Sequence, residues 1–344
     1  MDEPDFGEVT PLRERTTEHG VNFNNTTHLS KGLTSIRKHT LFGQTPAKRI
    51  IPQISQLQEN ADSQKIPILL CKQWTLYSVT PLYKFSYSRL KDYSRLLSAF
   101  IATEKQKGLA VEVGNDLGIK VTLSTLLGLK GTDQDDEAIL VQVRSVANIT
   151  NSYQGMTWCG WFSCTYRLDL LENVTEDFTC LPVFLVNGAE SLTAIVGTWF
   201  QKTFDCCFSQ LTINPLNLAW MAAMWTACKM DSHMTAVELI FSVPCSPQSL
   251  DISYAIHPQD AKALWQSIQK TQGEVLQEEV DLFMNCLYSH FHRHFKIHLS
   301  ATRLVKVSTP VASAHSDGKI KIQHSQYLIG VLSLLTELAI AHIQ

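Results

Sequence analysis

Histidines form the one cluster in this sequence whose spacing resembles a site for chemistry. His290, His292, His294 and His298 lie close together in the chain. On a helix, His290 and His294 would share a face, as paired metal ligands do. Arg293 beside them would oppose a divalent cation, and the acid that a hydrolase of the His-x-His-x-Asp-His type needs before its third histidine is missing. We therefore predict surface or capping histidines at a helix C-terminus, where the helix dipole favours positive charge, and no metal site.

Catalytic patterns of other kinds are also missing from the sequence. It has no phosphate-binding loop, no dinucleotide-binding glycine pattern and no nucleophile elbow. Asp231 with His233, and Cys245 with Ser246, offer no base–nucleophile pair at a spacing that constrains geometry. We predict a protein that is not an enzyme and needs no cofactor. The alternative is a nucleic-acid-processing enzyme whose catalytic residues are dispersed in the sequence.

Basic residues near the C-terminus offer a different chemistry, the binding of phosphate groups. No acid occurs between Asp281 and Asp317, a stretch that is rich in Lys, Arg and His. A cationic surface on ordered strands suits a phosphate backbone or an acidic partner. The alternative is an ordinary solvated sheet face, on which Lys and Arg are common. The candidates for DNA contact are Lys296, Arg303, Lys306, Lys319 and Lys321.

Two alternating runs predict the strands that hold these cations. From residue 295 to 302, apolar and polar residues alternate with the period of two that a strand requires. The run 319–322 alternates in the same way after a turn-rich connector, so the two runs predict a β-hairpin. Lys296 and Lys306 would share one face of the first strand. Arg303 breaks this parity, which predicts a bulge that re-aims its side chain.

The other periodicities predict an α+β fold with a large, mostly antiparallel sheet flanked by helices. Short connections favour antiparallel pairing, because a parallel crossover needs a dozen or more residues. The folded domain would span residues 63–344, with two possible sub-lobes at about 63–186 and 187–344. The other strands are expected within 73–85, 109–113, 118–126, 137–146, 156–166, 178–186, 237–243 and 250–256. The helices are expected at 88–107, 189–206, 218–230, 258–269, 278–294 and 327–343.

Residues 1–62 predict a disordered regulatory tail. They are rich in Thr, Asn, Glu and Gln, contain few apolar residues and show no sustained period. Within this tail, Thr45 is followed by proline and then, two residues further, by Lys48, which is the form that proline-directed kinases prefer. Thr45 is therefore the phosphorylation candidate. A phosphate there would add about two negative charges to a basic segment.

Two expected helices carry more large apolar residues than one helix face accommodates. The helix at 218–230 has scarcely any polar face, and the helix at 327–343 is apolar almost all round. Each would either be buried or form a partner surface. The second lies beside a sheet whose edges the sequence does not visibly protect, so a partner would add strands or a helix there. The candidates for this partner interface are Tyr327, Leu328, Leu332 and Leu335.

Composition limits where such a protein works. The 344 residues carry a formal net charge of −3, so any affinity for nucleic acid must be local. The nine cysteines show no Cys-x-x-Cys spacing and behave as small hydrophobic residues. No apolar N-terminal stretch resembles a signal peptide, and the longest apolar run carries Glu337 near its middle. We expect a soluble, intracellular protein without membrane contact.

From about residue 50 to the C-terminus, the chain resembles the centromere protein L family of vertebrates. The strings that carry the resemblance are QWTLY at 73–77, YKFSY at 83–87, NGAES at 187–191, GTWFQKTFD at 197–205, WMAAMWTAC at 220–228, SVPCSPQSL at 242–250 and YSHFHRHFK at 288–296. They are long idiosyncratic strings rather than short motifs. The first forty residues and residues 148–154 do not take part in the resemblance.

The resemblance implies a non-enzymatic structural subunit of the constitutive centromere-associated network, the inner-kinetochore assembly on centromeric chromatin. It implies a nuclear protein at the centromere that is needed for chromosome segregation in mitosis. The implied partners are centromere protein N, as a heterodimer, and centromere protein C with other inner-kinetochore subcomplexes. Contact with the centromeric nucleosome and its DNA would be made as part of the complex. An adaptor that never touches DNA is a third possibility.

Overall fold

In the computed structural model, the described residues are 47–54, 64–107, 118–145, 156–165, 175, 177–229, 236–245 and 249–343. Most of the strands among them belong to one sheet. They are β2 (Gln73–Val79), β4 (Ile119–Leu126), β5 (Ala138–Ser145), β6 (Met156–Ser163), β8 (Val183–Gly188), β9 (Phe208–Gln210), β10 (Val237–Val243), β11 (Leu250–Ile256), β13 (Arg303–Ser308), β14 (Ala312–His315) and β15 (Lys319–Ile322).

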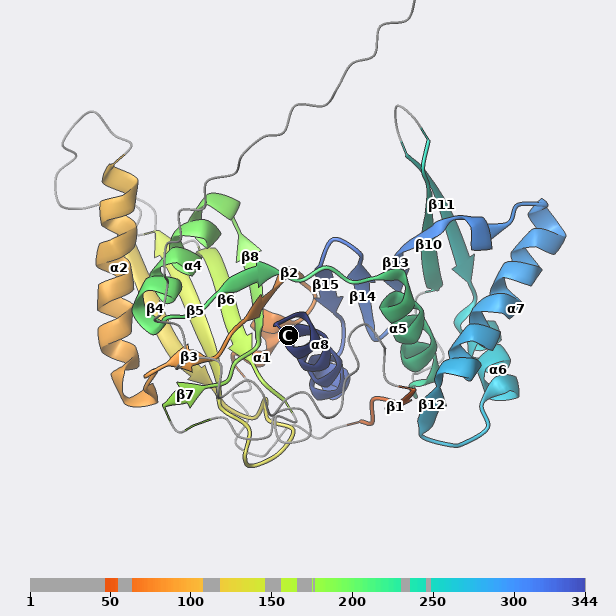
Figure 1. Ribbon diagram of the computed structural model, residues 1–344, viewed down its shortest axis with the longest axis horizontal. Helices are drawn as coiled ribbons and strands as arrows, with labels where there is room; N and C mark the ends of the chain where they lie inside the picture. Colours follow the sequence, from red (N-terminus) through yellow and green to blue (C-terminus); the bar gives the residue numbers. More distant parts are fainter. Residues whose placement is uncertain are drawn as a thin grey trace, which may run out of the picture.

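This eleven-stranded sheet crosses the molecule from end to end (Figure 1). Its strands lie in the order β11-β10-β13-β14-β15-β2-β8-β6-β5-β4, and β9 pairs with β2 beside this path. Every pairing in it is antiparallel, as the short connections predict. Two small sheets accompany it: β1 (Lys48–Ile50) pairs with β12 (Glu274–Leu276), and β3 (Leu82–Tyr83) pairs with β7 (Phe178–Thr179). The α+β prediction is confirmed.

The helices among the described residues are α1 (Ile66–Leu69), α2 (Leu90–Gln106), α4 (Glu190–Phe204), α5 (Pro215–Ala227), α6 (Pro258–Ile268), α7 (Gln277–Phe295) and α8 (Leu328–Ile343). α1 was not expected from the sequence. The others begin and end within a few residues of their expected bounds. The start of α5 shows why such bounds are predictable. Asn214 accepts a hydrogen bond from the Asn217 backbone N–H at 2.7 Å, and Pro215 occupies the first turn, where its missing N–H costs nothing.

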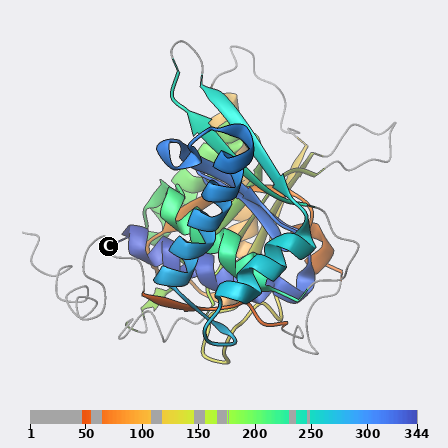
Figure 2. The same ribbon diagram turned by 90° about the vertical axis from the view of Figure 1, so that its right-hand side faces the viewer.

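The two faces of the sheet pack against different helices. One face carries residues such as Trp74, Trp161 and Phe241, and α5, α6, α7 and α8 cover it. The other face carries Phe162 and Phe184 and packs against α2 and α4, but only at the end that runs from β4 to β8. In Figure 2 the opposite end, with the β10–β11 hairpin and α7, faces the viewer.

The expected domain limits differ from those of the structure. Residues 47–54, placed in the disordered tail, include strand β1. A division near residue 186 would cut through β8, and β2 pairs both with β8 and with β15. The strand expected at 109–113 and residues 1–46, with Thr45, lie outside the described residues.

Candidate nucleic-acid interface

At the β10 to β15 end of the sheet, one side is left uncovered by α2 and α4. Residues paired directly across neighbouring strands point to the same side of a sheet, so the strand register assigns the side chains of this surface. None of them is buried. On β10, β13, β14 and β15 they are Glu238, Ile240, Ser242, Arg303, Lys306, Ser308, Ser313, His315, Lys319 and Lys321. We call this surface the open face.

The bulge predicted at Arg303 is present. The pairing of β13 with β10 shifts its register after Leu304, which leaves Val305 as the extra residue. Without it, Arg303 and Lys306 would point to opposite sides, because they are three positions apart. With it, both lie on the open face. The break in alternation was therefore a correct signal of the bulge.

Two lysines and a histidine form a row on the open face. Lys306, His315 and Lys319 lie directly opposite one another on β13, β14 and β15, and neighbouring strands are about 4.8 Å apart. Lys321 lies one pair further along β15, opposite Ser313. The strands thus place several cations at a spacing that a flexible tail would not hold.

Two acids lie against this row, and the sequence did not reveal one of them, Glu238, as a neighbour. Glu238 Oε2 is 3.4 Å from Lys306 Nζ. Asp317 lies in the turn between β14 and β15, with Oδ1 2.6 Å from His315 Nδ1 and Oδ2 2.6 Å from Lys319 Nζ. The pairing of β10 with β13 brings Glu238 next to a lysine 68 positions away. An acid-free stretch of sequence is therefore not an acid-free surface.

Lys296 does not lie on the open face, so its predicted place is corrected. α7 continues to Phe295, and Lys296 ends it in a left-handed conformation with φ 59°, its N–H bonded to the His292 carbonyl oxygen at 2.9 Å. A short 3-10 turn over Leu299–Ala301 follows instead of the expected strand. β14, and not the segment 295–302, is the hairpin partner of β15. The alternation was misleading because Phe295 also keeps helical spacing from Phe291, with ring centroids 4.6 Å apart.

The histidines of α7 make local contacts. His290 Nδ1 lies 2.7 Å from the Tyr254 hydroxyl oxygen. The His292 ring stacks on His298 at 3.9 Å between centroids, and the His290 and His294 rings are 4.6 Å apart. Among the described residues, no three His, Cys, Asp or Glu side chains are arranged to hold a metal ion. Asp231, His233 and Ser246 lie outside those residues.

The partner surface expected on the C-terminal helix is wrong for the side chains that were named. Tyr327, Leu328, Leu332 and Leu335 have no exposed area, because the sheet and the other helices cover them. By length and composition this helix resembles a membrane span, but it is mostly buried inside the protein. The Trp-rich helix α5 is also core, with Trp220 and Trp225 buried.

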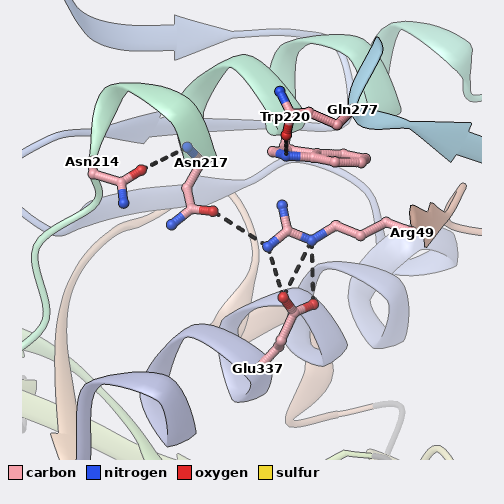
Figure 3. A network of polar contacts seen from close by, with 6 residues as sticks. All are labelled: Arg49, Asn214, Asn217, Trp220, Gln277 and Glu337. Carbon is pink, nitrogen blue, oxygen red and sulfur yellow. Dashed lines mark hydrogen bonds and ion pairs between the residues drawn. The ribbon is translucent and has the colours of Figure 1, made fainter. Parts of the chain in front are cut away.

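A buried arginine that the sequence did not indicate ties β1 to the fold (Figure 3). Arg49 donates two hydrogen bonds from Nε and one from Nη2 to the carboxylate of Glu337 in α8, the shortest at 2.6 Å. Its Nη2 also lies 3.3 Å from Asn217 Oδ1, and its guanidinium lies over the Trp220 ring, 4.7 Å from the centroid. Trp220 in turn donates to Gln277 Oε1 at 2.8 Å. This network joins segments that are 288 positions apart.

The two edges of the sheet differ in their protection. At one edge, α2 occupies the outer side of β4: Ser94 Oγ accepts from the Leu123 N–H at 2.8 Å, and Ser98 Oγ donates to the Ile119 carbonyl oxygen at 3.1 Å. At the other edge, β11 pairs with β10 and with no other strand that the structure describes. No other described residue bonds to the backbone of β11. A seven-residue strand with an open edge can accept a further strand.

Two of the buried thiols, those of Cys159 and Cys228, are poor nucleophiles. Burial raises the pKa of Cys159 to about 11 and that of Cys228 to about 12. A thiol with such a pKa carries almost no thiolate near neutral pH, and the thiolate is the reactive form.

Comparison with known proteins gives consistent matches along the chain. The family model of centromere protein L matches residues 68–340. The chain is 66% identical to centromere protein L of Homo sapiens and 64% identical to that of Bos taurus, each over 346 residues that cover 100% of both chains. It is 67% identical to centromere protein L of Gallus gallus over 305 residues, 88% of each chain.

Proposed function

Because the chain belongs to the centromere protein L family, we propose that it is a non-enzymatic structural subunit of the inner kinetochore that works as a heterodimer with centromere protein N. The family places it in the nucleus, at the centromere and kinetochore of the chromosome. Within the constitutive centromere-associated network it would bind centromere protein C and other subcomplexes. Its loss would impair chromosome segregation in mitosis.

The open edge of β11 is the observation that best supports a partner. The other edge of the same sheet is covered by α2, whereas β11 has no proline or lysine and only one charged residue, Asp251, to discourage pairing. Leu250 at its start is 59% exposed. A strand of centromere protein N that pairs with β11 would satisfy this edge and bury Leu250. The partner surface would then be a sheet edge instead of the helix expected from the sequence.

Lysines on the edge test this mode of pairing. Leu250→Lys together with Ala255→Lys places two charges at exposed positions of β11, so the fold should tolerate them. We expect the co-expressed partner to separate from the variant in size-exclusion chromatography, while circular dichroism and Tm stay within 2 °C or so of the parent. Leu216→Lys, at an exposed position in α5, is the control and should keep the partner. A double variant that still co-elutes with its partner would exclude pairing at β11.

Contact with centromeric DNA is the second part of the proposal, and the open face supports it. Lys306, Lys319 and Lys321 share one side of adjacent strands, and Arg303 joins them through the bulge. Such a surface binds phosphates without reading bases, so binding should be insensitive to DNA sequence. In the triple variant Lys306→Glu, Lys319→Glu, Lys321→Glu, we expect weaker DNA binding by an intact heterodimer. The slope of log K against log salt should fall by about 0.9 for each phosphate that the variant no longer neutralises.

A charge-matched control separates this effect from net charge. Lys91, Lys105 and Lys107 lie on or directly after α2, and their reversal to Glu changes the total charge equally. DNA affinity that is unchanged in the open-face variant would indicate a solvated sheet face and an adaptor without DNA contact. Loss of the heterodimer would assign the lysines to the partner. Nuclease activity in the purified heterodimer would instead support the dispersed-site enzyme.

Phosphorylation of Thr45 would act through the tail. The residue lies outside the described residues, two positions before Ala47, whose carbonyl oxygen accepts a hydrogen bond from Gln277 N–H at 3.1 Å. We propose that phosphorylation in mitosis modulates assembly without altering the fold. Mass spectrometry of mitotic protein with good coverage and an unmodified Thr45 would contradict it.

A further inference from the structure

The open face carries its own counter-ions. Lys306 is paired with Glu238, and Asp317 lies between His315 and Lys319. Before a phosphate can take the place of either carboxylate, an existing ion pair must open. The cations of this row are therefore not fully available to a nucleic acid.

Neighbouring groups hold both acids in place. Ser253 on β11 donates a hydrogen bond to Glu238 Oε1 at 2.8 Å. Asp317 belongs to a tight turn in which Gly318 has φ 80°, and a Cβ at Gly318 would collide with the Leu211 carbonyl oxygen. Gln210 Nε2 also donates to the Asp317 carbonyl oxygen at 3.1 Å. The backbone of this turn is thus fixed, which keeps the Asp317 carboxylate beside Lys319.

Both acids are ionised at neutral pH. The hydrogen bond from Ser253 lowers the pKa of Glu238, and the charge of Lys306 adds to this effect against partial burial. Partial burial would raise the pKa of Asp317, but the hydrogen bond from Lys319 and the charge of His315 outweigh it, so the pKa lies below its ordinary value. Each acid therefore contributes a full negative charge to the surface.

The other two cations of the open face differ from the paired ones. Within the described part of the chain, neither Arg303 nor Lys321 has an acidic partner. They lie at two ends of the face, Arg303 on β13 opposite Ser242 and Lys321 on β15 opposite Ser313. A duplex would meet these two first and would reach the central row only by displacing the carboxylates.

We propose that Glu238 and Asp317 are tuning residues that restrain DNA binding by the open face, so that neutralising either acid strengthens it. This inference rests on the proposed contact between the open face and DNA. Loss of either acid should therefore change the DNA affinity in the opposite direction to loss of a lysine. Weak binding by the single chain would favour occupancy where other subunits add contacts, since each contact contributes to the total affinity.

Single neutralising substitutions test the inference directly. The full-length chain, co-purified with its partner, is titrated into a fluorescein-labelled 30-bp duplex of arbitrary sequence, and anisotropy is read between about 50 and 200 mM salt. We expect Asp317→Asn to tighten binding about 3- to 10-fold near 100 mM salt. The salt slope should become steeper by up to about 0.9, because Lys319 becomes free to neutralise one more phosphate. Glu238→Gln should act in the same direction through Lys306.

Asp281→Asn is the matched control. Asp281 is exposed on α7, which packs on the covered side of the sheet, and the substitution changes net charge by the same amount. It should shift affinity less than twofold or so, because charges further apart than about 10 Å are screened at this salt. An equal gain in Asp281→Asn would show a net-charge effect and overturn the inference.

The remaining outcomes separate the inference from the function on which it rests. If Asp317→Asn and Glu238→Gln bind no more tightly while the triple lysine variant loses affinity, the DNA contact stands and the counter-ion role is wrong. If the triple lysine variant binds DNA as the parent does, the DNA contact and the counter-ion role both fall.

Discussion

At the scale of single residues, Arg49 contributes more to the stability of the fold than its position near the start of the chain suggests. Its side chain is 5% exposed, whereas that of Glu337, its partner, is 24% exposed. The neighbouring residue Lys48 also makes an ion pair, with Glu274 at 2.6 Å, but those side chains are 50% and 37% exposed. Water screens the second pair far more than the first. Two adjacent cations on β1 therefore differ in their contribution to stability.

This difference gives a test by urea unfolding. Arg49→Ala leaves the mostly buried Glu337 carboxylate without its partner and removes the stacking on Trp220. We therefore expect the free energy of unfolding to fall by about 2–4 kcal/mol. Lys48→Ala removes a solvated pair and should cost less than about 1 kcal/mol. Equal losses in the two variants would mean that β1 is not anchored through Arg49.

Single residues also show how far sequence reasoning reaches. The bulge at Arg303 was predictable, because a break in alternation is local in the chain. The cap at Asn214 is equally local, because its hydrogen bond reaches only to Asn217. The contacts Arg49–Glu337 and Lys306–Glu238 join residues 288 and 68 positions apart, and local periodicity carries no information about such pairs.

At the scale of elements, α8 shows what an all-apolar helix can mean. Its sequence is equally consistent with a buried helix and a partner surface, because both need apolar residues all round. The sheet on one side and α5 on the Arg49 side enclose it here, and Leu335 is fully buried. A segment such as 295–302 shows the same limit, since eight alternating residues do not distinguish a strand from a helix end with a turn.

Burial of α8 predicts that Leu335→Glu unfolds the protein. A carboxylate at this position loses its hydration and removes a packed leucine, which together cost at least about 4 kcal/mol, a large part of a domain's stability. Ala341→Glu, at an exposed position of the same helix, should leave Tm nearly unchanged. Circular dichroism melts compare them. A folded Leu335→Glu variant that has lost only its partner would restore the partner-surface interpretation.

At the scale of the whole molecule, the order of the strands in the sheet could not be predicted from the sequence. Strand lengths and antiparallel pairing follow from local patterns and short connections, but β2 lies between β15 and β8, which are far apart in the chain. Only packing of the complete chain decides such an order. The same order determines where the candidate surfaces lie. β4 and β11 are the two edges of the sheet, and the open face lies next to β11.

The contrast between the edges predicts that α2 keeps the molecule from associating through β4. Ser94→Ala with Ser98→Ala removes the hydroxyls that bond Leu123 N–H and the Ile119 carbonyl oxygen, so those backbone groups face outward unpaired. We expect a loss of about 1 kcal/mol for each hydroxyl and a concentration-dependent self-association in analytical ultracentrifugation. Thr103→Ala, which removes only a hydroxyl bonded within α2, should sediment as the parent does. If the double variant stays as monodisperse as that control, the packing of α2 side chains is enough to protect the β4 edge. Unpaired backbone groups at β11 would then not by themselves indicate a partner strand.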